Sequence, residues 1–247
     1  METSPDEEES LFEDSLEIHG IDWVAMFAYC DETENAPLFG VASYLFSKNG
    51  AKAFRRFFND HILNLLPLDK NGVKMYHSSQ CILGYEPFDK LSTPEREQIV
   101  DLMVEGIKKS VSLGVVILMP KDSYSSAIKT SPDVRSLAGD EYSQCLTRCI
   151  EYNADWLDQK KIAGRIEYVI EAGCNHQKEA TAILAGISNS PELKRRYRLH
   201  DYSFRDKGPH IPQIFTPDLL AWEWQRAHIN AMFFPFSEIH YVVDFSD

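Results

Sequence analysis

The chain divides into apolar runs of strand length and amphipathic segments of helical length. The apolar runs are rich in β-branched and aromatic residues, which is typical of strands buried in a sheet. They predict strands at residues 23–30, 38–46, 114–119, 165–170 and 197–204, and a short extended piece at 73–77. Apolar positions with helical spacing predict helices at about 49–66, 92–111, 140–159, 176–188 and 217–228. The aromatic tail, 229–247, fits neither pattern.

The order of these elements predicts an α/β fold. Only a short polar link, 32–36, joins the first two strands, so we expect them to pair antiparallel. After Gly139 helices and strands alternate, which favours parallel strands in the later part of the sheet. We therefore expect one domain over residues 21–247, a mixed sheet flanked by helices, with a helical insertion at about 49–112.

The negative charge of the chain is concentrated at its start. The formal net charge is −13, but residues 1–20 contain eight acidic residues and no lysine or arginine. The remaining chain has 30 acidic and 25 basic residues, which leaves a net charge of only −5. We expect the leader, 1–20, to be a disordered acidic tail, and the body to attract free nucleic acid only weakly.

Cysteine usage and the lengths of the apolar runs favour a cytoplasmic protein without a membrane segment. The apolar runs stop far short of the about 20 residues that span a bilayer. The acidic start lacks the basic region of a signal peptide. The five cysteines are an odd number and include no Cys-x-x-Cys pair, which favours reduced thiols.

Three acidic residues stand at the ends of predicted elements. Asp31 ends the first strand, Glu171 ends the strand at 165–170, and Asp218 lies in the first turn of the last helix. Such positions can converge on one edge of an open α/β sheet, where ligand sites usually lie. Mg²⁺ and Mn²⁺ prefer carboxylate oxygens, and two such ions can clamp the attacking and leaving oxygens of a phosphodiester. The pattern therefore predicts a carboxylate metal site.

Several short motifs occur in a defined order along the chain. They are Tyr29-Cys30-Asp31-Glu32-Thr33, Met75-Tyr76-His77, Tyr168-Val169-Ile170-Glu171, Phe204-Arg205-Asp206-Lys207 and Asp218-Leu219-Leu220-Ala221. Their order and spacing resemble the ribonuclease H-like fold and, more closely, the domain of unknown function 3800 family. The resemblance covers residues 23–228. It implies a ribonuclease H-like mixed sheet and a metal-dependent nuclease-type active site that acts on nucleic acid.

The resemblance also implies roles for individual residues. Asp31, Glu171 and Asp218 would bind Mg²⁺ or Mn²⁺. His77 and Lys207 would assist with water and phosphate. The candidates for a fourth carboxylate are Glu32, Glu141 and Glu151. Neighbours on a strand point to opposite faces, so only one of Asp31 and Glu32 can easily face the site.

Each of these residues also has a simpler structural interpretation. Pro217 stands where the family usually has Ala, and it should begin the helix just ahead of Asp218. With Thr216 as the N-cap, the helix dipole alone favours an acid at that position. Lys207 can pair with a phosphate, pair with the carboxylates or remain solvated, and His77 can be structural.

These observations leave three functions open. The leading hypothesis is a metal-dependent hydrolase that cleaves a phosphodiester in nucleic acid. The first alternative is a catalytically silent module of the same fold that binds nucleic acid or protein. The second is a phosphohydrolase acting on a small nucleotide, which needs no basic groove. The basic cluster Lys194-Arg195-Arg196 with Arg198 can contact a nucleic-acid backbone or mark a solvated helix end.

Overall fold

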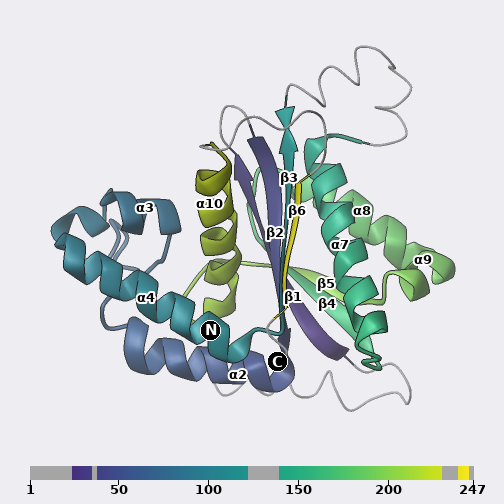
Figure 1. Ribbon diagram of the computed structural model, residues 1–247, viewed down its shortest axis with the longest axis horizontal. Helices are drawn as coiled ribbons and strands as arrows, with labels where there is room; N and C mark the ends of the chain where they lie inside the picture. The colour runs from purple at the N-terminus through teal and green to yellow at the C-terminus, as the bar shows by residue number, and fades with distance from the viewer. Residues whose placement is uncertain (1–23, 35–37, 122–138, 230–238, 245–247) are drawn as a thin grey trace.

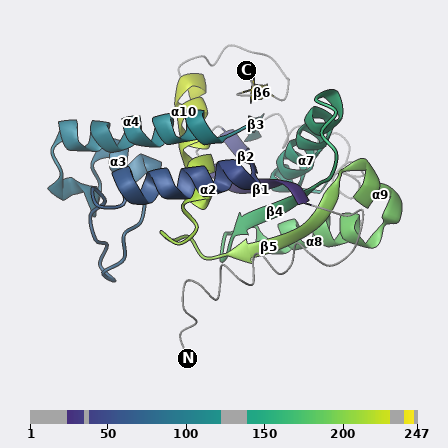
Figure 2. The ribbon, with the colours of Figure 1, turned by 90° about the horizontal axis from the view of Figure 1, so that it is seen from below.

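A computed structural model describes residues 24–34, 38–121, 139–229 and 239–244 as a three-layer α/β fold (Figure 1). One sheet lies between two groups of helices, with α2, α3, α4 and α10 on one face and α7, α8 and α9 on the other (Figures 1 and 2). The expected α/β class, with a mixed sheet flanked by helices, is therefore confirmed. The acidic leader lies outside the described residues.

The elements follow one another in the order that the sequence suggests, with a few additions. The strands are β1 (Val24–Glu34), β2 (Leu38–Ser47), β3 (Leu113–Pro120), β4 (Arg165–Glu171), β5 (Leu199–Arg205) and β6 (Ile239–Asp244). The α-helices are α2 (Lys48–Phe57), α3 (Ser78–Leu83), α4 (Thr93–Ser110), α7 (Glu141–Gln159), α8 (Gln177–Asn189), α9 (Pro191–Arg196) and α10 (Thr216–Ile229). A π-helical turn (Phe58–Ile62) extends α2, and short 3₁₀ turns lie at Phe88–Lys90 and Pro212–Phe215.

The sheet has six strands in the order β5-β4-β1-β2-β3-β6. The pairs β1–β2, β2–β3 and β3–β6 are antiparallel, whereas β4 pairs parallel with both β1 and β5. The expected antiparallel first strands and parallel later strands are both present. This topology puts the carboxyl ends of β1, β4 and β5 at one edge of the sheet.

Strand β1 lies inside the sheet, between β4 and β2, and its side chains pack into two separate cores. Phe27 and Tyr29 belong to the core between the sheet and α2, α4 and α10, whereas Ala28 and Cys30 belong to the core beneath α7 and α8. Since side chains alternate along a strand, the next residue, Asp31, points toward the side of α10. The last parallel pair joins Cys30 with Ile170, so Asp31 lies just beyond the β4 ladder while it still pairs with β2.

Capping residues fix the helix starts that the sequence predicts. Ser92 and Glu95 form a reciprocal capping box at the start of α4. The side chain of Asp140 accepts a hydrogen bond of 2.8 Å from the Ser143 N–H at the start of α7. Gly50 allows a close approach between helices, because a Cβ atom there would lie 2.2 Å from the carbonyl oxygen of Ser110 at the end of α4.

Several predicted boundaries are wrong, because pairing and packing between distant segments set them. Strand β1 continues to Glu34, since β2 supplies hydrogen-bond partners beyond the apolar run. The segment 73–77 is not a strand, and its only bridge joins Lys74 with Leu68. The strand near 197–204 is not the last one, because β6 follows it and pairs with β3. Helices α3 and α9 were not expected. In the described part of the chain, no helix is long and apolar enough to cross a membrane.

Candidate functional site

Asp31 is a buried carboxylate near the carboxyl end of β1, just beyond its pairing with β4. The residue is only 9 % exposed although its side chain is ionisable. Its Oδ1 accepts a hydrogen bond of 2.9 Å from the backbone N–H of Glu32, and its Oδ2 accepts one of 3.0 Å from Nζ of Lys207. The two oxygens therefore have separate partners, as buried polar groups require.

Lys207 connects the carboxyl ends of β1 and β4. The register of β4 and β5 places Glu171 opposite Arg205, and the Ala172 N–H donates to the Arg205 carbonyl at 2.8 Å. The chain that leaves β5 therefore starts beside Glu171. Nζ of Lys207 donates to Oε2 of Glu171 at 2.8 Å as well as to Asp31. The Lys207 side chain is only 4 % exposed, so both ion pairs are largely shielded from water.

Asp218 and His77 reach the same region from the helical side. Asp218 lies in the first turn of α10, and its Oδ2 accepts a hydrogen bond of 2.7 Å from the backbone N–H of Ser78. This bond fastens the start of α3 to the start of α10, and it places His77 next to the carboxylate. Asp218 interacts electrostatically with Asp31, Lys207 and His77. All five predicted site residues therefore lie in one neighbourhood, which we call the carboxylate cluster.

The start of α10 differs in detail from the expectation. Thr216 is the first residue of the helix rather than its cap, and its hydroxyl donates to the Gln213 carbonyl at 2.7 Å. A 3₁₀ turn, Pro212–Phe215, runs directly into α10 and removes the need for a side-chain cap. Pro217 lies in the first turn, where its missing N–H costs no helical hydrogen bond.

The cluster contains more negative than positive charge. Burial above all, together with the negative charges of Asp218 and Glu171 and against the opposing effect of Lys207, raises the pKa of Asp31 to about 7. Burial lowers the pKa of Lys207, but the three carboxylates outweigh burial and raise it above its ordinary value. When all groups are ionised, three carboxylates face one ammonium. The raised pKa of Asp31 means that burial and the neighbouring carboxylates together outweigh the effect of Lys207.

Burial also sets the protonation state of His77. Its pKa is lowered, first by burial and then by the ammonium of Lys207, while Asp218 and Glu171 act in the opposite direction. The imidazole is therefore neutral at neutral pH, the form that can accept a proton.

Of the three candidates for a fourth carboxylate, Glu141 and Glu151 lie outside the cluster, whereas Glu32 borders it and interacts electrostatically with Glu171 and Lys207. Glu32 points away from Asp31, and its Oε1 accepts from the backbone N–H of Asn175 at 3.2 Å. Glu151 is paired with Arg148 at 2.7 Å and lies beside α9. Glu141 begins α7, which packs on the opposite face of the sheet from α10 (Figure 1). Of the candidates that the sequence left open, Glu141 and Glu151 belong to a helix that covers the other core.

The carboxylate oxygens of the cluster are suitable ligands for a hard divalent cation. In the present arrangement, however, they do not surround a common position for such an ion. Carboxylate oxygens are the ligands that Mg²⁺ and Mn²⁺ prefer. Among the described residues, however, no three His, Cys, Asp or Glu side chains are arranged to hold one ion. The ammonium of Lys207 lies between Asp31 and Glu171, so these carboxylates can share an ion only if Lys207 withdraws.

Sequence reasoning did not anticipate two contacts. The backbone N–H of Ser78 holds Asp218, a contact that leaves no signal in side-chain chemistry. Arg165, at the start of β4, lies beside the basic cluster formed by α9 and by Arg198 at the start of β5, although it is thirty residues away along the chain. Its position as the first residue of a predicted strand did not indicate this contact.

Comparisons with protein-family models and with curated proteins found no match.

Proposed function

We propose that this domain is a divalent-metal-dependent hydrolase of the nuclease type, which cleaves a phosphodiester at the carboxylate cluster. The observation that carries the proposal is that three carboxylates, those of Asp31, Glu171 and Asp218, gather around the single ammonium of Lys207. When Lys207 withdraws and all three carboxylates are ionised, one divalent cation would offset two of the three negative charges. A purely structural ion pair would need no third carboxylate, and burying unbalanced charge is costly.

The sheet topology supports the same proposal at the level of the fold. Strands β1, β2 and β3 are antiparallel, and β4 and β5 are parallel to β1, which is the arrangement that the resemblance to ribonuclease H-like proteins implies. We therefore propose a ribonuclease H-like domain related to the domain of unknown function 3800 family. Similar folds carry unrelated activities, so the argument for hydrolysis depends on the cluster itself.

Within this proposal each residue has a role. Asp31, Glu171 and Asp218 would hold Mg²⁺ or Mn²⁺, and the bound ion would supply charge stabilisation at the phosphate and an activated water. His77, neutral at pH 7, would accept a proton from that water. Lys207 would leave its two carboxylates and donate to a phosphate oxygen of the nucleic acid.

One observation favours a second function. Lys207 already forms short contacts with both Asp31 and Glu171, so the cluster can also act as a structural lock without an ion. In that case the domain would be a catalytically silent module that binds nucleic acid or protein.

The test is a calorimetric Mn²⁺ titration of the wild-type chain and of Asp31→Asn, beside cleavage assays. The substrate panel would contain single- and double-stranded DNA and RNA and mononucleotides, so that it separates a nuclease from a small-nucleotide phosphohydrolase. Asp31→Asn should weaken Mn²⁺ binding at least about tenfold and abolish cleavage, because a neutral amide is a poorer ligand and leaves less negative charge for the ion. Asp201→Asn is the matched control, since Asp201 is exposed on β5. A wild-type chain that binds no Mn²⁺ would reject the hydrolase and favour the silent module.

A further inference from the structure

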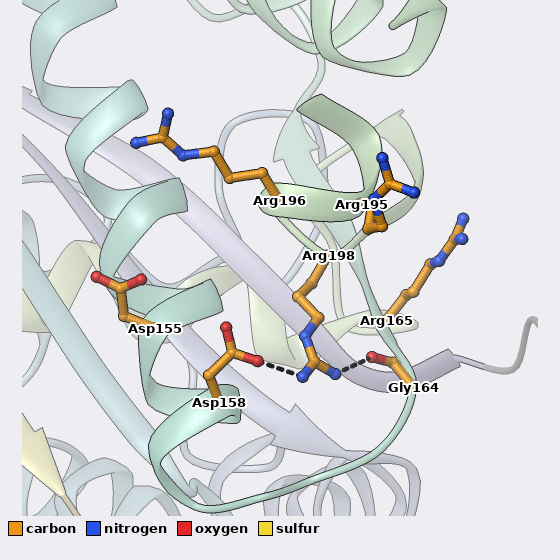
Figure 3. A pocket seen from close by; sticks show the side chains of 7 residues that line it. All are labelled: Asp155, Asp158, Gly164, Arg165, Arg195, Arg196 and Arg198. Carbon is orange, nitrogen blue, oxygen red and sulfur yellow. Dashed lines mark hydrogen bonds and ion pairs between the residues drawn. The ribbon is translucent and has the colours of Figure 1, made fainter. Parts of the chain in front are cut away.

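A second charged region lies at the other end of β4. A pocket of about 580 Å³ opens where the end of α7, the start of β4 and the short helix α9 meet (Figure 3). Its walls carry four arginines and two aspartates: Arg165, Arg195, Arg196, Arg198, Asp155 and Asp158. We call it the arginine pocket. Arg165 and Glu171 are the two ends of β4, so the pocket lies about 20 Å along the strand from the carboxylate cluster.

Arg198 builds the floor of this pocket. Its backbone has a positive φ of 54°, an uncommon conformation for a residue with a side chain. Its Nη1 donates to the carbonyls of Ile162 at 3.1 Å and Gly164 at 3.0 Å, and its Nη2 pairs with Asp158 (Figure 3). Arg198 therefore fixes the loop before β4, and its own charge is already compensated.

The charge of Arg195 is not compensated. Among the described residues, no acidic side chain pairs with its guanidinium, although the residue lines the pocket. Arg196 has only a weak partner, because its nearest contact with Glu151 is 4.0 Å and its side chain is 67 % exposed. The ring of Tyr197 lies 5.2 Å from the Arg196 guanidinium and supports it from below. Four of the lining residues are arginines and two are aspartates, so the lining itself carries more positive than negative charge.

The composition of the pocket indicates what it can recognise. Apart from Gly164, every lining residue is charged, so the polar groups that the walls offer to a ligand are mainly guanidinium and carboxylate groups. Guanidinium groups match the geometry of phosphate oxygens and can contact them with two parallel hydrogen bonds. The rest of the body carries net negative charge, so this local excess is where a phosphate would be attracted.

We propose that the arginine pocket binds phosphate groups, at a site separate from the carboxylate cluster. Arg195 is the main contact of the phosphate, with Arg165 and Arg196 on the same rim, and Arg198 holds the loop before β4 through Ile162 and Gly164. This inference does not depend on the proposed hydrolase activity, because it uses none of the cluster residues. The phosphate can belong to a small phosphorylated ligand or to the backbone of a nucleic-acid strand, and the test distinguishes the two.

The experiment uses the full chain in EDTA, so that no divalent ion occupies the carboxylate cluster. The probes are inorganic pyrophosphate, followed by calorimetry, and a labelled single-stranded oligonucleotide, followed by anisotropy between about 50 and about 200 mM salt. For Arg195→Ala we expect clearly weaker binding and, with the oligonucleotide, a salt slope that is smaller by about one. Arg56→Ala is the matched control, because Arg56 is an exposed arginine near the end of α2, on the other face of the sheet.

A second variant should change affinity in the opposite direction. Asp155 lines the pocket and is exposed, so Asp155→Asn removes a repulsive charge without removing a buried contact. We expect it to tighten binding by about twofold to fivefold. A loss of stability cannot mimic such a gain.

The results for Arg195→Ala and Asp155→Asn with the two probes lead to different conclusions. If Arg195→Ala weakens the binding of both probes, the pocket receives backbone phosphates of a nucleic acid. If it weakens only pyrophosphate binding, the ligand is a small phosphorylated molecule. If Arg195→Ala behaves like Arg56→Ala with both probes and Asp155→Asn leaves the affinities unchanged, the pocket is not a phosphate site.

Discussion

The two ends of β4 carry opposite excess charge in opposite environments. In the carboxylate cluster, the Lys207 side chain is 4 % exposed and its partner Asp31 10 %. In the arginine pocket, the side chains of the pair Arg198 and Asp158 are 25 % and 57 % exposed. The same kind of ion pair is therefore shielded at one end of the strand and open to water at the other.

This difference decides what each region can do. A buried excess of negative charge is expensive, so the cluster must be compensated by a specific cation, whether Lys207 or a metal ion. An exposed excess of positive charge is solvated and screened within about 10 Å at moderate ionic strength. Changes in the cluster should therefore alter the stability of the fold and the binding of metal ions. Changes in the arginine pocket should alter the binding of anions, and that binding should depend on salt concentration.

The largest effect is expected when the buried cation is removed. Lys207→Met keeps the length of the side chain but leaves Asp31 and Glu171 without their shared partner. In EDTA we expect the free energy of unfolding to fall by about 3–5 kcal/mol, as for other buried ion pairs that lose one partner. Urea unfolding in EDTA and in Mn²⁺ measures this. Mn²⁺ should restore much of the loss, because the ion can take the place of the ammonium.

The control for this change is an exposed lysine that also pairs with an acid. Lys109 forms a salt bridge with Glu105 on α4, and the two side chains are 60 % and 48 % exposed. Lys109→Met should cost less than about 0.5 kcal/mol. If Lys207→Met is no more destabilising than Lys109→Met, the contrast between the buried and the exposed region is wrong. A loss that Mn²⁺ does not reduce would mean that the carboxylates do not share an ion.

An intermediate effect is expected at the floor of the arginine pocket. Arg198→Ala removes the bonds to the carbonyls of Ile162 and Gly164, and we expect a loss of about 1.5–3 kcal/mol, typical of hydrogen bonds from a charged group. Arg198→Gly should be less destabilising than Arg198→Ala by about 1 kcal/mol, because glycine tolerates the positive φ. Thermal or urea unfolding of the two variants provides the comparison. Equal losses would show that the backbone conformation carries no cost.

The sequence was informative where a local pattern determines the outcome. The apolar run before Asp31 and the helical spacing at 92–111 and 140–159 depend on neighbours in the chain, and the structure has the corresponding elements. Strand alternation also separates Asp31 from Glu32 correctly, since their carboxylates have different partners. These features follow from the periodicity of strands and from the unpaired N–H groups at helix starts.

The sequence was less informative where distant segments meet. Nothing in the loop around Lys207 indicates whether its ammonium is solvated, because that depends on the register that places Arg205 opposite Glu171. Helix α7 carries Glu151, but only the three-dimensional fold shows that α7 covers the opposite core. Strand β6 was missed for the same reason, since its partner β3 lies more than a hundred residues earlier in the chain.

The smallest effect on stability is expected at the rim of the arginine pocket. Arg195 has no acidic partner among the described residues, so Arg195→Ala should change the free energy of unfolding by less than about 0.5 kcal/mol. It may be compared directly with Arg198→Ala, which removes an arginine from the same pocket but breaks bonds to backbone carbonyls. Urea unfolding at low and at high salt measures both variants. If Arg195→Ala is as destabilising as Arg198→Ala, Arg195 is a structural residue, and the proposed distinction between the floor of the pocket and its phosphate-binding rim is wrong.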